Sequence, residues 1–389
     1  MINLSDYLDP VSIDKQEIEL IAEQSQFSRN LVVHTENNPV ASLKGFRVAI
    51  LGVPDDRLSP ERGSASAPDE VRKALYPMAR IPGKIKIADL GNLKTGVNYN
   101  DTIAGLADVL YYLADYDILT VIIGGSGSLI QAVDRFYQTA GRSYQLTTID
   151  SRIDFHPESR EYGSVNSLFP LLQSARSKLS HFINIGYQTY LNDPQVVTRL
   201  SRRQFELVRL GEVRQAIHLT EPLFRDSEAI NFDIGAVRYA DAPGSYLPSP
   251  NGLYSEEACL LARYAGVSDK MKYFSLVEIN PAKDRSQQTA SLGAQIIWFL
   301  LESHAQRQSE NPAGNAEGSG RFTRYHINVD DLGEEMIFVK SNFTERWWIE
   351  LTAPGGKNHY VACSYEDYLR ANNNEVPDRW IRANSRFKQ

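Results

Sequence analysis

The chain has 389 residues, of which 42% are hydrophobic and 23% are charged, and its formal net charge is −7. This composition is ordinary for a globular protein, and the acidic balance argues against nucleic-acid binding, which requires clustered Lys and Arg. The two cysteines, Cys259 and Cys363, lack metal-type spacing and favour a reducing compartment without a disulfide framework.

The chain opens on MINLSDYLDP, which contains acids and no apolar run of the kind found in a secretory signal. No later stretch approaches the roughly 20 apolar residues that span a bilayer. We therefore expect a cytoplasmic protein with no membrane contact. Residues 1–45 show little periodicity and are predicted to form an N-terminal extension.

From residue 46 onward, short apolar runs alternate with segments of helical pattern. The strand candidates are Phe46–Val53, Lys86–Gly91, Ile118–Gly125, Tyr144–Asp150, Phe182–Tyr187, Glu206–Gly211, Ala229–Gly235 and Tyr273–Asn280. The helix candidates are Pro68–Met78, Asp101–Tyr116, Pro194–Arg203, Glu212–Arg225, Ser255–Tyr264 and Gln287–His304. This alternation predicts an α/β domain over residues 46–308, a three-layer sandwich in which helices cover both faces of a parallel sheet of about eight strands.

The character of the chain changes after this domain. Residues 309–320, SENPAGNAEGSG, are rich in small and polar residues and are predicted to form a linker. Residues 321–389 contain the aromatic-rich motifs RWWIEL and CSYEDYL, which indicate strands followed by a helix. We predict a small C-terminal α+β appendage.

Carboxylates follow several of the predicted strands. In parallel α/β sheets, ligands bind beyond the carboxyl ends of the strands, where such side chains converge. Clustered acids at this edge usually serve metal binding or acid/base chemistry. Spacing alone therefore predicts a carboxylate-rich metal site around Asp150, Asp154 and Asp233.

The order and spacing of the strand-end motifs over residues 46–304 resemble those of the arginase, agmatinase and formiminoglutamase family. The motifs are GVPDD at 52–56, ERGSASAPDEVR at 61–72, GGSGS at 124–128, DSRID at 150–154, FDIGAVRYADAPGSYLP at 232–248 and EINP at 278–281. The resemblance implies an arginase-like fold and assembly as a homo-oligomer. It also implies a centre of two divalent ions, typically manganese, at which a linear amidine C–N bond is hydrolysed.

The resemblance further implies six metal ligands, two His and four Asp. Three of these are kept as Asp150, Asp154 and Asp233. The lost ligand positions fall on Gly127, Arg152 and Gly235. Nearby, Ser126 and Arg238 replace family acids, and the histidine that serves as a proton shuttle falls near Tyr162. Glu278 resembles the acid that contacts substrate in the family.

Three clustered acids need a positive partner, because like charges about 4 Å apart cost on the order of 4 kcal/mol at an effective dielectric of 20. We favour Arg152, assisted by Arg238, as the replacement for the metal. One residual manganese ion is the main alternative, with His156 as a substitute ligand. The purely structural interpretations are that the Asp residues cap turns, that His156 is an ordinary loop residue, and that Glu278 caps a loop.

Three functions remain open from the sequence. The first is a pseudoenzyme without a cofactor, which acts through binding or assembly, with a protein partner held by the N-terminal or C-terminal addition. The second is a formiminoglutamase-like or agmatinase-like hydrolase with an altered one-metal centre and Glu278 in its catalytic site. The third is a sensor that binds a guanidino or formimino small molecule in the old pocket, beside Ser126, Ser128, His156 and Glu278.

Overall fold

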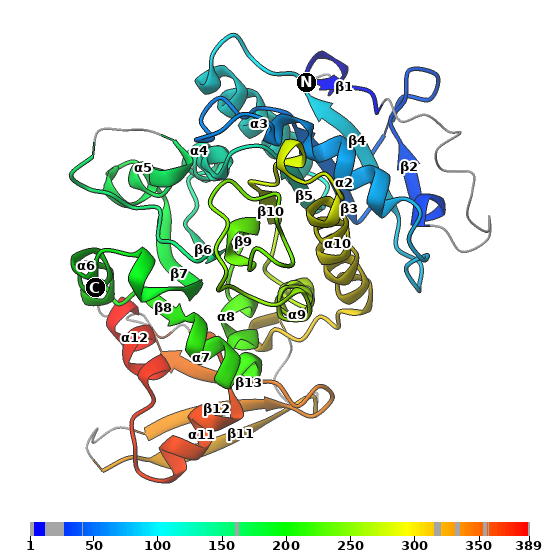
Figure 1. Ribbon diagram of the computed structural model, residues 1–389. Helices are drawn as coiled ribbons and strands as arrows, with labels where there is room; N and C mark the ends of the chain where they lie inside the picture. Colours follow the sequence, from blue (N-terminus) through cyan, green and yellow to red (C-terminus); the bar gives the residue numbers. More distant parts are fainter. Residues whose placement is uncertain are drawn as a thin grey trace.

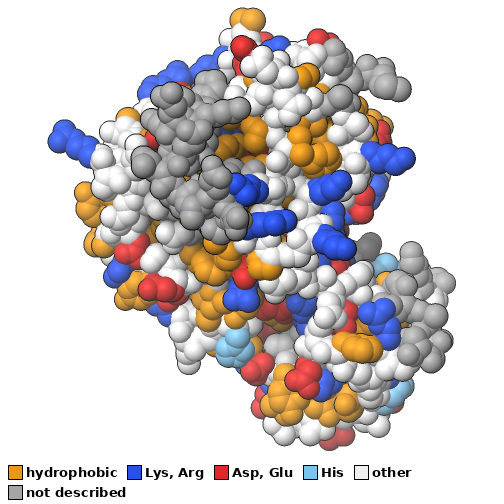
Figure 2. Space-filling view, turned by 90° about the vertical axis from the view of Figure 1, so that its right-hand side faces the viewer, with side chains coloured by type: hydrophobic (Ala, Val, Ile, Leu, Met, Phe, Trp, Pro, Cys, Tyr) orange, Lys and Arg blue, Asp and Glu red, His pale blue; other side chains and the backbone are white. Residues whose placement is uncertain are grey.

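The computed structural model describes residues 4–11, 27–40, 42–159, 163–314, 320–330, 335–352, 356 and 358–387. They form a large α/β body and a smaller C-terminal module (Figure 1). In the space-filling view, the module is a separate lobe that meets the larger body across a notch (Figure 2). No helix within the described ranges combines the length and the apolar character that a membrane crossing needs.

The central sheet contains the eight parallel strands that the sequence predicted. They are β3 (Val48–Val53), β4 (Ile87–Leu93), β5 (Leu119–Gly124), β6 (Tyr144–Ile149), β7 (Leu179–Tyr187), β8 (Glu206–Arg209), β9 (Ala229–Asp233) and β10 (Tyr273–Val277). Their order across the sheet is β4-β3-β5-β10-β9-β6-β7-β8. The middle strands are buried along their whole length, which explains why most of their residues are apolar.

Helices cover both faces of this sheet, so the predicted three-layer sandwich is confirmed. One face packs against α2 (Ala67–Leu75), α9 (Ser255–Gly266) and α10 (Gln288–Gln306). The other packs against α3 (Tyr99–Ala114), α4 (Ile130–Ala140), α5 (Phe169–Gln173) and α6 (Pro194–Arg202). The sequence analysis had not predicted α4 and α5.

One helix predicted from the sequence is wrong in extent. The segment Glu212–Arg225 is not one helix but contains most of α7 (Leu210–Gln215), a 3-10 turn (Ile217–Thr220) and α8 (Glu221–Arg225). The chain leaves helical geometry at Ala216, where φ is −152° and ψ is 64°. Pro222 then occupies the first turn of α8, where its missing amide donor costs nothing.

Two short segments of the N-terminal region join the main sheet. Strand β1 (Leu8–Asp9) pairs antiparallel with the outer side of β4, and β2 (Leu31–Val33) pairs parallel with the same strand. Two strands of two and three residues carry too little periodicity to be predicted from sequence.

The C-terminal module is an antiparallel sheet of β11 (Phe322–Asn328), β12 (Glu335–Ser341), β13 (Trp347–Thr352) and β14 (Asn358–Cys363), with α11 (Tyr365–Asn372) and α12 (Asp378–Phe387). It has a small core of its own, which includes Trp347, Phe338 and Trp380. The second tryptophan of the pair, Trp348, points to the opposite face, where Arg225 of the main body lies over its ring. Of the predicted linker, residues 315–319 lie outside the described part of the chain.

Candidate metal and substrate site

Three neighbouring parallel strands deliver the acids of the candidate site. In the sheet, β10, β9 and β6 are adjacent. Asp233 is the last residue of β9, Asp150 follows β6 directly, and Glu278 follows β10 directly. Asp154 reaches the same place from the loop after β6. Because parallel strands end at one edge of the sheet, these side chains converge there, as the sequence predicted.

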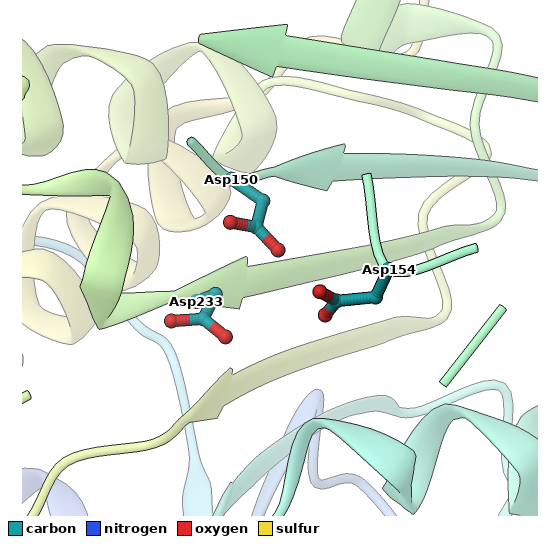
Figure 3. Close-up of side chains that lie close together, drawn as sticks. All are labelled: Asp150, Asp154 and Asp233. Carbon is teal, nitrogen blue, oxygen red and sulfur yellow. The ribbon is translucent and has the colours of Figure 1, made fainter. Parts of the chain in front are cut away.

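The three aspartates form a compact cluster. Each offers a carboxylate oxygen, and these oxygens all lie within 4.8 Å of one another. Figure 3 shows the three carboxylates turned toward a common space between the strand ends. The side chains are buried, with 7% of Asp150, 6% of Asp154 and 4% of Asp233 exposed. Little water is therefore available to separate their charges.

Hydrogen bonds leave much of the cluster unsatisfied. Asp150 accepts from the backbone amide of Arg152 at 2.8 Å, and Asp233 accepts from that of Gly235 at 2.6 Å. These bonds fix the side chains of Asp150 and Asp233 in tight local turns. Asp154 accepts no side-chain or backbone donor among the described residues, so both of its oxygens remain free to bind a cation.

Burial and mutual repulsion raise the pKa of all three carboxyls. Desolvation is the largest cause for each pKa, followed by Asp154 acting on Asp150, Asp233 acting on Asp154, and Asp150 acting on Asp233. Carboxyl groups in this state either keep protons or bind a cation. The cluster thus has the electrostatic character of a cation site, and Asp150 and Asp233 cap local turns at the same time.

Glu278 is fixed beside the cluster by an unusual backbone and by several donors. Its φ is +63°, a left-handed conformation that is strained for a residue other than glycine. One carboxylate oxygen accepts from the Gly127 amide at 2.7 Å, from the Ser164 hydroxyl, and from Ser59 at 3.4 Å. Burial raises the pKa of Glu278 despite these donors. This carboxylate also acts on the pKa of each aspartate, so it faces the cluster.

Gly127 lies where a side chain would point into the site. A Cβ built on it would lie 3.7 Å from Glu278 Oε1 and 4.0 Å from Asp233 Oδ2. Space therefore exists at this position for a larger residue directed at the cluster. At Gly235, in contrast, a Cβ would approach Asp233 Oδ1 to 2.9 Å.

The predicted role of Arg152 as a forked partner of two carboxylates is not borne out by the contacts. Its guanidinium forms no hydrogen bond or ion pair with a described carboxylate. It acts at longer range, where it lowers the pKa of all three aspartates without overcoming desolvation. The contact prediction failed because the Arg152 backbone, and not its side chain, turns toward Asp150.

Arg238 also does not replace a metal. It pairs with Asp241 at 2.9 Å and lies over the ring of Tyr254, with 4.2 Å from Cζ to the ring centroid. These neighbours hold the guanidinium away from the aspartates, which explains why the sequence-based prediction is wrong.

The remaining predicted pocket residues divide into two groups. Ser126 and Ser128 are buried, and the Ser126 hydroxyl bonds to that of Ser164 at 2.7 Å. His156 is exposed and is not among the residues whose ligand atoms meet at the cluster. It therefore does not substitute for a lost imidazole ligand. Tyr162 lies outside the described residues.

Two site residues escaped the sequence analysis. Ser164 bridges Ser126 and Glu278. Tyr246 is buried, and its pKa is raised by burial and then by the charges of Asp154, Asp233, Asp150 and Glu278, so it lies in the electrostatic field of the acids. A serine or tyrosine in a loop carries no spacing signal. Only the position of Tyr246 in the FDIGAVRYADAPGSYLP motif pointed toward the site.

Comparison with known families agrees with this geometry. The model of the arginase family matches residues 46–302. The chain belongs to the arginase family. Formimidoylglutamase of Salmonella arizonae is 23% identical over 267 residues, which cover 65% of this chain and 84% of that protein. The corresponding enzyme of an Enterobacter species is 23% identical over 266 residues, with 65% and 85% covered.

Solved structures show the same fold. Trypanosoma cruzi formiminoglutamase with Mn²⁺ superposes with a TM-score of 0.63 at 18% identity, covering 68% of this chain and 95% of that one. Formimidoylglutamase of Bacillus subtilis gives a TM-score of 0.65 at 16% identity, with 76% and 97% covered. Proclavaminate amidino hydrolase of Streptomyces clavuligerus gives 0.59 at 23% identity, with 68% and 94% covered.

These relatives favour the hydrolase alternative over the pseudoenzyme that we preferred from the sequence. They equally favour manganese over the absence of a cofactor. The donor set in this chain fits one divalent ion, because three carboxylates converge and Asp154 is unpaired. At the position where the resemblance places a second ion beside Asp150 and Asp233, the chain carries Arg152 and Gly235, whose side chains are not metal ligands.

Proposed function

We propose that this arginase-family protein hydrolyses a C–N bond of a linear amidine at a centre that holds one divalent cation, with manganese as the preferred ion. The observation that carries the proposal is the cluster of Asp150, Asp154 and Asp233, whose buried carboxylates approach within 4.8 Å and raise one another's pKa. Oxygen donors of this kind suit manganese, magnesium and calcium. When bound, such a cation supplies Lewis acidity that makes water a stronger nucleophile.

The other residues of the site have roles that follow from their positions. Glu278 presents a fixed carboxylate beside the cluster, and a planar amidinium can donate two N–H groups to such an acid. Ser164 and the Gly127 amide hold Glu278 in place. Burial and the nearby acids raise the pKa of Tyr246, so its phenol stays neutral beside the site.

The relatives indicate which substrates to test. Formimidoylglutamase is the name shared by the bacterial relatives, so formiminoglutamate is the first candidate, followed by agmatine and arginine. The test is release of formamide, ammonia or urea by the full chain loaded with manganese. We expect activity toward one of these substrates and its loss in Asp233→Ala. No release of product with any of them, in protein shown to bind manganese, would contradict the proposal.

A non-catalytic binding role is the second candidate function. It is favoured by Gly127, Arg152 and Gly235, which leave no second cation site. The C-terminal module and the N-terminal strands then supply the surface for a protein partner. Metal content separates the candidates: about one manganese per chain supports the hydrolase, none supports the binding protein, and two contradicts both.

A further inference from the structure

The C-terminal sheet has one edge that the main body covers and one that it does not. At the covered edge, the amide of Ala362 in β14 donates to Asp226 at 2.9 Å, and Arg379 donates to the carbonyl of Ala362. Arg225 donates to the carbonyl of Cys363 at 2.9 Å. The opposite edge is β11, and no strand within the described ranges pairs with its outer side. This strand lies on the side of the lobe that points away from the larger body (Figure 1).

The backbone of β11 directs alternate residues outward. The amide of Asn342 donates to the carbonyl of Arg321 at 2.8 Å, and the antiparallel register with β12 continues from there without a shift. In such a ladder, residues alternate between facing the neighbouring strand and facing away from it. Phe322, His326 and Asn328 therefore direct their amide and carbonyl groups to the outer side. An edge of this kind is a template for a further strand.

Strand β11 lacks most of the features that protect an exposed edge. It is seven residues long, FTRYHIN, and contains no proline, glycine or lysine. No bulge interrupts its pairing with β12, and none of its residues is fully buried. Phe343, which is 66% exposed, lies in the turn after β12, and Arg321 at the start of this edge lies over its ring. An added strand would therefore bury apolar surface as well as satisfy backbone groups.

We propose that β11 pairs with β11 of a second copy of this chain, so that the C-terminal sheet continues across a two-fold axis. Antiparallel pairing over all seven residues sets Phe322 opposite Asn328 and Thr323 opposite Ile327. Tyr325 falls on the axis, opposite its own copy. Outward-facing residues of one strand then meet outward-facing residues of the other, as backbone hydrogen bonding requires.

The same register brings charged side chains together without net repulsion. It sets Arg324 of one copy opposite His326 of the other. Arg324 pairs with Glu350 at 3.0 Å, and His326 pairs with Glu335 at 2.9 Å, so each basic side chain brings its own acid. Sliding the strands by two residues would instead set Arg324 or His326 opposite itself, and like charges directly opposite are destabilising. This self-complementarity favours a second copy over an unrelated peptide.

Sedimentation velocity of the full chain measures the assembly. His326→Pro removes an outward amide donor and keeps the inward groups that bond to β12, and edge strands tolerate proline at such a position. His326→Ala is the matched control, because it removes the same imidazole and keeps the amide. We expect the wild type and His326→Ala to have twice the mass of His326→Pro, whatever assembly the main domain itself forms.

Hydrogen exchange shows where the copies meet. The amides of Phe322 and Asn328 should exchange at least about tenfold more slowly in the wild type than in His326→Pro, and exchange in β8 should be equal in the two proteins. If His326→Pro unfolds the module, Asn328→Pro at the last residue of the strand tests the same outer side. It should weaken self-association at least about tenfold.

Two results would overturn the proposal. One is unchanged self-association in a folded proline variant, because the copies would then meet elsewhere. The other is equal exchange of the Phe322 and Asn328 amides in the wild type and the variant, which would leave this edge for an extended segment of a different protein. Neither result bears on hydrolysis, because β11 follows the arginase-family domain in sequence. Asp233→Ala should therefore self-associate like the wild type.

Discussion

Arg379 of α12 donates from Nη1 to both carboxylate oxygens of Glu206 on β8, at 2.8 and 2.9 Å. Both side chains are buried, and Asp226 lies 3.2 Å from the same guanidinium. Arg379 and its neighbours hold the pKa of Glu206 well below its usual range despite the burial that would raise it. This ion pair joins the C-terminal module to an edge strand of the main sheet.

Substitution of Arg379 by alanine should destabilise the protein strongly. It removes the main cationic partner of buried Glu206 and leaves Asp226 only its pair with Lys270, and breaking a buried pair from one side costs about 3 to 5 kcal/mol. Urea unfolding measures the loss. Arg209→Ala is a matched control because it breaks a pair with Glu212 that is largely exposed. Equal stability of the two variants would show that the Arg379–Glu206 ion pair does not stabilise the folded protein.

Asp154→Asn should change stability in opposite directions with and without cation. In chelator, the raised pKa means that the folded protein keeps a proton that the unfolded chain releases above about pH 4, so stability falls as pH rises through the folded pKa. Asparagine lacks this cost, and the variant should melt higher than the wild type at pH 8.

Manganese should reverse that order. The wild type gains about 2.7 kcal/mol at a cation concentration of a hundred times Kd, and the variant gains little. Differential scanning fluorimetry with and without manganese measures both effects. Glu375 is an exposed acid far along the chain, and the Glu375→Gln variant should show the same stabilisation by manganese as the wild type. A variant that still gains full manganese stabilisation would remove Asp154 from the cation site.

Gly127→His should increase cation affinity. A Cβ fits at this position without contacts closer than 3.7 Å, and the nearest atoms belong to Glu278 and Asp233. An imidazole adds a nitrogen donor, which favours zinc more than magnesium. We expect the ratio of zinc to magnesium affinity to rise at least about tenfold by competition titration. Gly127→Ala should leave that ratio unchanged, and a similar rise in it would mean that the imidazole is not a ligand.

His304 should make the protein sensitive to acid. This side chain is buried in α10, and burial lowers its pKa to about 3. Between pH 6.5 and 3, the unfolded chain binds a proton that the folded chain refuses, so this group's contribution to stability is lost as pH falls, by roughly 1.4 kcal/mol per pH unit. His304→Gln should lose less stability over the same range.

Urea unfolding at pH 7, 6 and 5 tests the His304 prediction. The carboxylates titrate in both proteins, so their contributions cancel in the difference between wild type and variant. A difference that does not change with pH would mean that folding does not lower the pKa of His304.

The sequence predicted the sheet well because burial on both faces produces continuous apolar runs, as in β3. It failed at β1 and β2, which are too short to show a period. The three aspartates were predicted because strand ends converge in any parallel sheet. The partners of Arg152 and Arg238 were not predicted. The direction of a long side chain depends on neighbours such as Asp241 and Tyr254, whose positions are set by tertiary packing.

Elements from the two ends of the chain lie at the two edge strands of the parallel sheet. On one side, β1 and β2 cover the outer edge of β4 with strands of two and three residues. On the other, α12 is bonded to β8. Short or covered margins discourage sheets of separate molecules from joining strand to strand. Joining of two molecules strand to strand at the described margins of this sheet is therefore disfavoured.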